Sequence, residues 1–315
     1  MWADFHFAIL ITAPVFCILG LGILFKRLGW ITDEFARIGS ELVFKVTLPC
    51  LLFVKLVETD FRHGLPVTLV GYALIATVIL FLLLDRVVAP RLQEPRDRGV
   101  FVQGAYRSNM GIIGLAFCLS AFGEASVTTA SVYLAVMTTL FNVLAVITLT
   151  RHRGEAVGQG KLLPVFTGIL KNPLILAIAA GVLISLSGIK VSQIVLNTGS
   201  YFAQMTLPLA LLCAGATIRL YEFQASRPLY WAVAGKLLLV PLLLTAGGVA
   251  VGLRGECLGV LYLMCAAPTA AASYPMAQAM KANHHLAAAI IAATSLGSLL
   301  STTLGIFLLR QFALI

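Results

Sequence analysis

The sequence contains few charged residues. Only 11% of its 315 residues are Asp, Glu, Lys or Arg, whereas 60% are hydrophobic. A soluble globule of this size needs more polar side chains to cover its surface, so the composition excludes that class. The sequence instead predicts an integral membrane protein with the lipid bilayer as a partner.

Acidic residues and catalytic motifs are also scarce. The chain has 13 Asp and Glu residues, and neither residues 100–123 nor residues 257–280 contain one. This disfavours a cation/proton antiporter, which needs an intramembrane acid. The patterns H-E-x-x-H and G-x-S-x-G are absent, so we expect no enzymatic activity.

The six cysteines form no C-x-x-C pair and no metal-like spacing with histidine. Most of them lie in apolar runs, where cysteine usually acts as a small packing residue. We therefore expect no disulfide framework, no metal site and no cofactor.

The apolar runs are long enough to cross a bilayer. A span needs roughly 20 apolar residues, and ten such runs occur. The first has Asp4 and His6 in place of a basic start and no cleavage site follows it, so we expect a retained helix and not a signal peptide. The predicted spans lie near residues 5–25, 35–57, 66–88, 100–122, 126–149, 172–187, 193–218, 229–252, 257–280 and 286–309.

The formal net charge of +9 reflects basic loops. Lys and Arg gather in the loops that follow the odd-numbered spans, as cytoplasmic loops do. We therefore expect a multi-pass protein with extracytoplasmic N- and C-termini, and no nucleic-acid partner.

The two halves of the chain repeat at an offset of 159 residues. Chance coincidence of prolines and glycines is the alternative, but several matches share this offset. Because each half has five spans, the second half enters the membrane in the opposite sense. The sequence predicts two inverted five-helix repeats, residues 1–150 and 165–315, joined by a cytoplasmic linker at 151–164. The matched pairs are Pro14 and Pro173, Gly22 and Gly181, Gly29 and Gly188, Thr47–Pro49 and Thr206–Pro208, and Asn109 and Pro268.

Spans four and nine contain helix-breaking residues at mid-membrane depth. Glycine and proline lower helix propensity by about 1 and about 3 kcal/mol. A broken helix is tolerated in lipid only where protein or a water-filled cavity supplies hydrogen-bond partners. We expect breaks around Gly111 and Gly114, and around Pro268 and Pro275, that cross at the bilayer centre. The alternative is a pair of kinked packing helices without a ligand.

Two further prolines, Pro49 and Pro208, lie in apolar surroundings, and we interpret them as kinks of a scaffold. Arg107 is the strongest candidate for a binding residue, because an intramembrane guanidinium can hold a carboxylate by two hydrogen bonds. Its alternatives are snorkelling to the surface or pairing with backbone carbonyls. Lys236 is either a second cation near the site or a side chain that snorkels to the surface, and we expect snorkelling. The other expected substrate-binding residues are Ser108, Asn109, Thr269, Ser273, Tyr274 and Gln278.

Three stretches resemble the auxin efflux carrier family of bacterial and plant permeases. They are KVTLPCLLFVKLVETDF (45–61), QGAYRSNMGIIGLAF (103–117) and APTAAASYPMA (267–277). The R-x-N-x-G-x-x-G-L pattern that begins at Arg107 is fairly specific, and the resemblance covers essentially the whole chain. One departure is Ala116, where relatives often have proline, which leaves the sharpness of the first break open.

The resemblance implies an all-α fold of ten transmembrane helices, similar to bile-acid symporters and sodium/proton antiporters. Spans one, two, six and seven would form a scaffold for a moving domain, with elevator-type alternating access and often a homodimer. Asn109 and the Pro268 region would line the substrate site. The short cytoplasmic loop is typical of a bacterial carrier, which implies the bacterial inner membrane.

Together these features predict a secondary transporter of small organic anions, such as malonate or an auxin-like acid. Coupling to H⁺ or Na⁺ stays open. The alternatives are a sodium-coupled symporter of the bile-acid type and a non-transporting membrane sensor.

Overall fold

The structure is a computed structural model that describes residues 2–58, 66–152, 173–189, 191–218 and 226–315. These residues form helices and no named strand. Helical segments occupy all ten of the ranges predicted to span the membrane. They are α1 (Trp2–Arg27), α2 (Asp33–Leu42), η1 (Val43–Thr47), α3 (Leu48–Val57), α4 (Val67–Leu83), η3 (Leu84–Val88), η4 (Ala89–Arg91), α5 (Pro95–Tyr106), η5 (Met110–Gly114), α6 (Leu115–Phe122), α7 (Ala125–Arg151), α9 (Pro173–Ser187), α10 (Gln193–Ala216), α11 (Arg227–Ala234), η7 (Gly235–Leu239), α12 (Val240–Ala250), α13 (Gly255–Ala266), α14 (Ser273–Ala279) and α15 (His284–Gln311).

Five of the described helical stretches are long and apolar enough to cross a membrane: 4–27, 67–91, 126–151, 227–250 and 284–311. Three shorter apolar helices cover 110–122, 176–187 and 255–266. The helices at 110–122 and 255–266 are short because spans four and nine are interrupted. Each of these two spans therefore consists of two half-helices. Most of the predicted 151–164 linker lies outside the described residues, and α7 runs two residues past the predicted end of its span, to Arg151.

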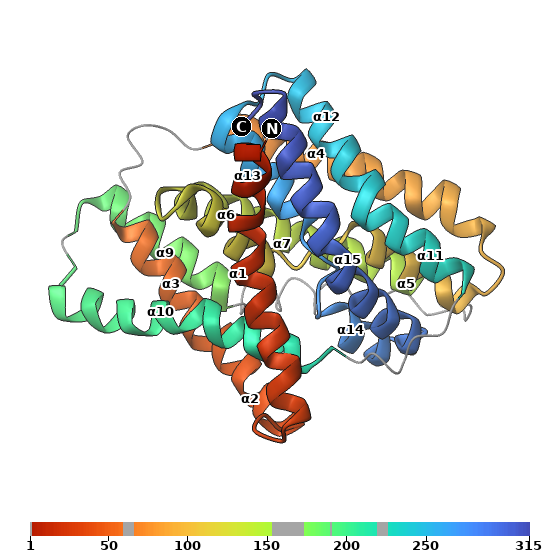
Figure 1. The fold of residues 1–315 in the computed structure, drawn as a ribbon, viewed down its shortest axis with the longest axis horizontal. Coiled ribbons are helices and arrows are strands. Elements are labelled where there is room, and N and C mark those ends of the chain that lie inside the picture. Colours follow the sequence, from red (N-terminus) through yellow and green to blue (C-terminus); the bar gives the residue numbers. More distant parts are fainter. Residues whose placement is uncertain (1, 59–65, 153–172, 190, 219–225) are drawn as a thin grey trace.

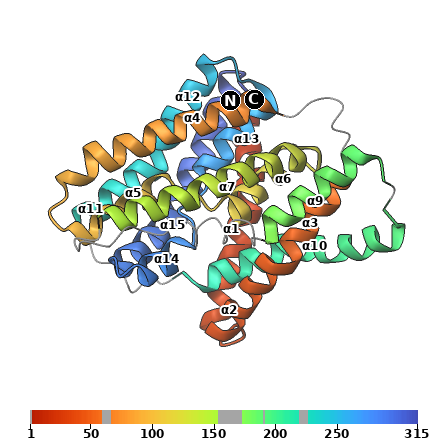
Figure 2. The same cartoon turned by 180° about the vertical axis from the view of Figure 1, so that it is seen from behind.

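Helices α3, α9 and α10 gather on one side of the molecule, and α4, α5, α11 and α12 lie on the other (Figures 1 and 2). Helix α1 packs along α10 and α15, and α3 packs against α9 and α10. The helices predicted as a scaffold therefore contact one another. That these helices stay in place while the other helices move past them remains a prediction.

Two close helix approaches occur at the same offset of 159 residues. A Cβ atom at Gly22 of α1 would overlap the Leu212 carbonyl oxygen of α10. A Cβ at Gly181 of α9 would lie 3.2 Å from the Phe53 carbonyl oxygen and 2.9 Å from the Leu56 Cβ of α3. Subtracting 159 from 181 and from 212 gives 22 and 53. Each of the two contacts therefore joins the first half of the chain to the second, and the duplication itself remains a prediction.

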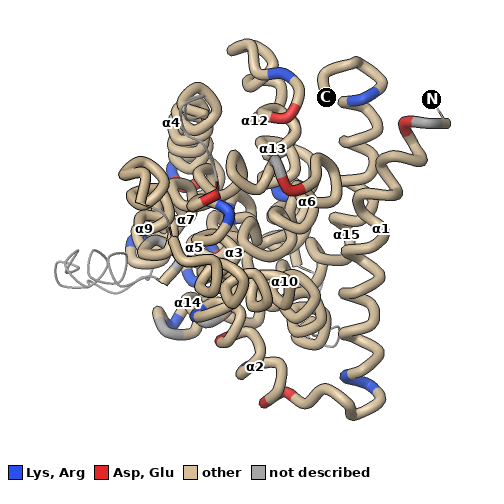
Figure 3. Tube along the Cα trace, turned by 90° about the vertical axis from the view of Figure 1, so that its left-hand side faces the viewer, with Lys and Arg blue, Asp and Glu red and all other residues tan. Residues whose placement is uncertain are grey.

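The two chain ends lie at the same end of the molecule (Figure 1). The Arg310 Nε lies 3.4 Å from an Asp4 carboxylate oxygen, and the Gly255 amide donates to the Leu314 carbonyl at 2.8 Å. Most described helical turns carry no charged residue (Figure 3). Long helical stretches with few charges are typical of membrane spans.

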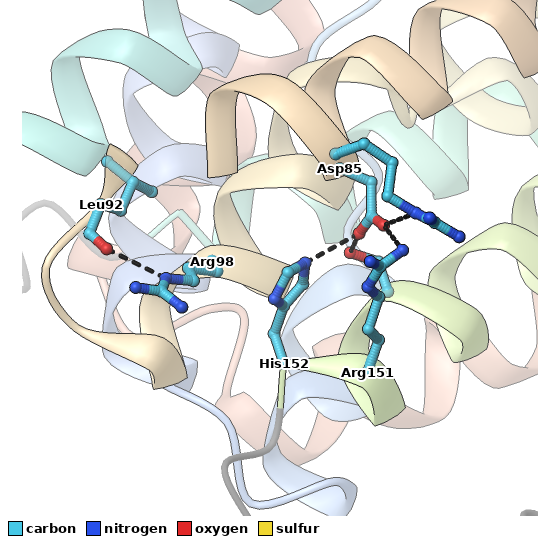
Figure 4. A network of polar contacts seen from close by, with 7 residues as sticks. Asp85, Leu92, Arg98, Arg151 and His152 are labelled. Atoms are coloured by element: carbon cyan, nitrogen blue, oxygen red, sulfur yellow. Dashed lines mark hydrogen bonds and ion pairs between the residues drawn. The ribbon is translucent and has the colours of Figure 1, made fainter. Parts of the chain in front are cut away.

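A buried carboxylate joins the end of α4 to the end of α7 (Figure 4). Asp85, in the π-helical turn η3, is only 1% exposed. Its oxygens accept from Thr148 Oγ1 at 2.6 Å and from Arg151 Nη1 at 3.0 Å, and one lies 2.9 Å from His152 Nε2. A buried charge needs such partners, and here they fix the position at which α7 ends.

Candidate functional site

The two interrupted helices meet in the interior of the protein. Helix α5 ends at Tyr106 and the helical chain resumes at Met110, while α13 ends at Ala266 and α14 begins at Ser273. The intervening segments, 107–109 and 267–272, lie side by side. We call this region the crossing.

Backbone hydrogen bonds hold the two segments of the crossing together. The Asn109 amide donates to the Pro268 carbonyl at 2.7 Å, and the Ala270 amide donates to the Arg107 carbonyl at 3.0 Å. These bonds flank an isolated antiparallel bridge between Ser108 and Thr269. Backbone groups of each break therefore bond to backbone groups of the other break, in place of the partners that a continuous helix would supply. Backbone groups that are buried away from water require such partners.

Arg107 is 5% exposed, so it does not snorkel. Its Nη2 donates to the Asn142 Oδ1 of α7 at 2.6 Å, and its Nη1 lies 2.6 Å from the Met276 sulfur of α14. Among the described residues it forms no ion pair. A thioether sulfur is a weak hydrogen-bond acceptor. The Nη1 group of the guanidinium is therefore available to a stronger acceptor.

Lys236 corrects our expectation of snorkelling. It is 0% exposed, in the π-helical turn η7. Its ammonium donates to the Ser108 Oγ at 2.5 Å and to the Cys265 carbonyl at 2.8 Å. Oxygen acceptors within reach replace water, so the side chain has no need to extend to a surface.

Polar side chains from α5 and α15 complete the crossing. Thr269 Oγ1 donates to the Gly104 carbonyl at 2.7 Å, and the Thr269 amide donates to Thr294 Oγ1 of α15 at 3.1 Å. Gln103 Nε2 donates to the Ser273 carbonyl at 3.1 Å. The Gln103 Oε1 and the Ser273 Oγ are buried and have no hydrogen-bond partner among the described residues. Two polar atoms are thus available to a further ligand.

The structure groups only part of the predicted site. Arg107, Ser108, Asn109, Thr269 and Ser273 all lie at or next to the crossing.

The remaining two predicted substrate-binding residues lie farther along α14. Tyr274 is half-buried and its ring packs edge-on against His284, with centroids 5.7 Å apart. Gln278 is exposed, near the end of α14. A short helix carries these two side chains away from the point where the breaks meet.

The predicted break positions also shift. Pro268 lies within the second break, but Pro275 lies inside α14, at its third residue, where the missing amide hydrogen costs little. Gly111 and Gly114 lie in the π-helical turn η5 and not in the break itself. Gly114 instead lies close to α13, because a Cβ there would be 2.9 Å from the Met264 sulfur.

A cavity of about 420 Å³ lies between α1, α3 and α10 on one side and α6 on the other. Leu115 and Ala116 of α6 line it, as does Pro208 of α10, one of the two predicted kinks. The other predicted kink, Pro49, is the second residue of α3, which follows the turn η1. The cavity lining also includes Lys55 and Glu124, whose charged groups are 2.5 Å apart. The residues of the crossing do not line this cavity.

The crossing combines two buried cations with hydroxyl, amide and carbonyl groups. Within the described residues, neither Arg107 nor Lys236 has an acidic partner, and no cluster of three or more His, Cys, Asp or Glu could hold a metal ion. Positive charge that is buried in this way is favoured by a negatively charged partner. The sequence did not reveal Gln103, Asn142 and Thr294 as contributors; their only distinguishing feature is a polar side chain within an apolar span.

Comparison with known proteins agrees with this membrane architecture. The chain is 24% identical over 304 residues to the protein named "Uncharacterized transporter YfdV" of Escherichia coli strain K12. The alignment covers 94% of this chain and 96% of the relative. The YfdV proteins of Escherichia coli O157:H7 and Shigella flexneri match equally well. A family model described as "Membrane transport protein" matches residues 7–306. The resemblance to the auxin efflux carriers is confirmed, and the chain belongs to this family of multi-pass membrane transport proteins.

Proposed function

We propose that the protein is a secondary transporter of small organic anions and that the crossing is its substrate site. The observation that carries this proposal is the pair of buried cations, Arg107 and Lys236, at two helix breaks that meet inside the protein. A charged group inside a membrane protein is costly and is usually functional. An anionic substrate would offset these charges.

In this proposal the Arg107 guanidinium binds a substrate carboxylate. Asn142 holds one end of the fork in place through the 2.6 Å bond from Nη2. A carboxylate oxygen is a stronger acceptor than the Met276 sulfur and would replace it at Nη1. The buried Ser273 hydroxyl and the half-buried Asn109 side chain would then contact the rest of the substrate.

The proposed movement is an elevator. Helices α1, α3, α9 and α10 would remain in place, and the crossing with its supporting helices would slide past them. The 420 Å³ cavity lies along that boundary, and we assign it to the substrate path. The Lys55–Glu124 pair joins α3 to the residue preceding α7, so it would break and reform during each cycle. Assembly as a homodimer and extracytoplasmic termini belong to the same proposal.

The test begins with binding. Purified protein is heated in the presence of mono- and dicarboxylates, and the acids that raise its unfolding temperature are then followed as radiolabelled substrates in proteoliposomes. Arg107→Gln should remove saturable uptake while the protein remains folded. The matched control is Arg37→Gln, because Arg37 is exposed and pairs with Glu41 on the surface of α2. Equal uptake by Arg107→Gln and the wild type would remove Arg107 from the site.

Coupling is measured in the same vesicles. Moving one charge against 100 mV costs about 2.3 kcal/mol, so export of an anion from a cell that is negative inside runs downhill. Uptake is therefore recorded under an imposed voltage, then under imposed proton and sodium gradients. Stimulation by sodium alone would favour a symporter of the bile-acid type. Absence of binding and of flux for every acid would refute the proposed function.

A further inference from the structure

We infer that Lys236 determines the charge of the anion that the crossing accepts, and that it favours dianions over monoanions. This inference rests on the proposed function, since it assigns a specificity role at the same site. From the sequence we favoured the membrane surface for this lysine over a position near the site, and the structure places it at the crossing.

The geometry gives Lys236 a direct connection to both breaks. Its Nζ donates to Ser108 in the first break and to the carbonyl of Cys265, one residue before α13 ends. The Ser108 hydroxyl itself also donates to the Cys265 carbonyl, at 3.2 Å. The ammonium is therefore fixed between the two interrupted helices. It sits on a π-helical turn, a feature that often occurs at functional positions.

A purely structural role would not require a positive charge. The acceptors of Lys236 are a hydroxyl and a backbone carbonyl, and a neutral donor such as glutamine could bond to both. Burying a full charge is far more costly than burying a neutral amide. No acidic residue in the described part of the chain forms an ion pair with Lys236, so the described residues do not offset its charge. An incoming anion is the partner that this charge fits.

Lys236 and Arg107 act on the same short segment of backbone. Lys236 bonds to Ser108, and Arg107 is the neighbouring residue in the chain. Together they place two positive charges at the crossing. A dianion neutralises both, whereas a monoanion leaves one buried charge uncompensated. Because interactions between charges are strong away from water, the second carboxylate of a substrate should increase affinity markedly.

The experiment uses matched acids that differ by one charge. Malonate and succinate are compared with their monoamides, malonamate and succinamate, which replace one carboxylate with a neutral group of similar shape. Affinities are measured by calorimetry on purified wild-type protein, Lys236→Met and Lys236→Arg. Lys45→Met is the control, because Lys45 is exposed and pairs with Glu41 on α2.

In the wild type we expect the better bound of the two dicarboxylates to bind on the order of ten-fold more tightly than its monoamide. This ratio should fall to about one in Lys236→Met and persist in Lys236→Arg and Lys45→Met. A ratio that is unchanged in folded Lys236→Met overturns the inference. If that variant does not fold, Lys236→Gln keeps both hydrogen bonds without the charge and tests the same point. A wild-type ratio near one overturns the inference without any variant.

The outcomes also separate this inference from the proposed function. If the wild type binds neither acids nor amides, the proposed function itself fails. If the wild type binds and transports acids with a ratio that is insensitive to Lys236, only the specificity role is lost.

Discussion

Replacing Gly22 with alanine should destabilise the protein although it adds only one methyl group. Gly22 faces α10 at a point where the two helix backbones touch, and a Cβ there would overlap the Leu212 carbonyl oxygen and lie 3.1 Å from the Ala216 nitrogen. Neither atom is the end of a flexible side chain, so only a shift of a whole helix can relieve the contact. Small residues are common where membrane helices approach this closely.

The expected magnitude follows from two opposing effects. Alanine is the better helix former, by about 1 kcal/mol, which favours Gly22→Ala. Overpacking of a close contact costs about 1–3 kcal/mol, and a contact between two backbones belongs at the upper end. The expected net loss is about 2 kcal/mol, which corresponds to a decrease of about 2–4 °C in the unfolding temperature.

Gly20 provides a matched control in the same helix. A Cβ at Gly20 meets no atom within 4 Å, so Gly20→Ala gains helix propensity without a clash. The assay is thermal unfolding of the two variants and the wild type in one detergent, followed by size-exclusion chromatography. Gly22→Ala should unfold at a lower temperature than the wild type, and Gly20→Ala at the same or a higher one. Equal unfolding temperatures for both variants would refute the packing of α1 on α10 described above.

Two further substitutions test the polar contacts. Asp85→Ala should lower the unfolding free energy by about 1.5–3 kcal/mol, because it leaves Arg151 and its neighbours without their buried carboxylate. The control is Asp33→Ala, at a side chain that is 84% exposed, which should cost less than about 1 kcal/mol in the same denaturation assay. Thr269→Val keeps the side-chain shape but removes the bond to the Gly104 carbonyl, so it should lower stability by about 1–3 kcal/mol and weaken acid binding in the thermal screen; an unchanged unfolding temperature and affinity would show that this bond does not support the crossing.

Much of the fold could be predicted from the sequence because hydropathy and helix-breaking residues act locally. The run from Arg107 to Asn109 lies in a glycine-rich stretch, and Pro268 follows a continuous apolar helix, so both breaks were expected near their observed positions. Gly111 and Pro275 were assigned to the breaks because they are poor helix formers. The structure shows that a π-helical turn accommodates the glycine and that the first turn of α14 accommodates the proline.

The site was less predictable because its members come from helices far apart in the sequence. Arg107 was found by its own charge, but the bond that it donates to Asn142 depends on how α7 packs beside α5. Lys236 was misjudged for the same reason. Its long side chain could have reached either a surface or a partner, and the partner, Ser108, is 128 residues away. Helix propensity and hydrophobic periodicity do not indicate which residues so far apart in the sequence come into contact.

The crossing also explains how two broken helices can be stable before any substrate binds. A helix end buried in a membrane protein leaves unpaired carbonyls and amides, and each would cost several kcal/mol if left alone. Here Pro268 accepts from Asn109, Arg107 accepts from Ala270, and the Cys265 carbonyl at the end of α13 accepts from Lys236. These bonds provide partners for backbone groups at both breaks, whereas no acidic residue in the described part of the chain pairs with either cation. A solute that enters such a site does not have to order the crossing, so its negative charge contributes directly to affinity. Removal of the solute should leave the crossing folded.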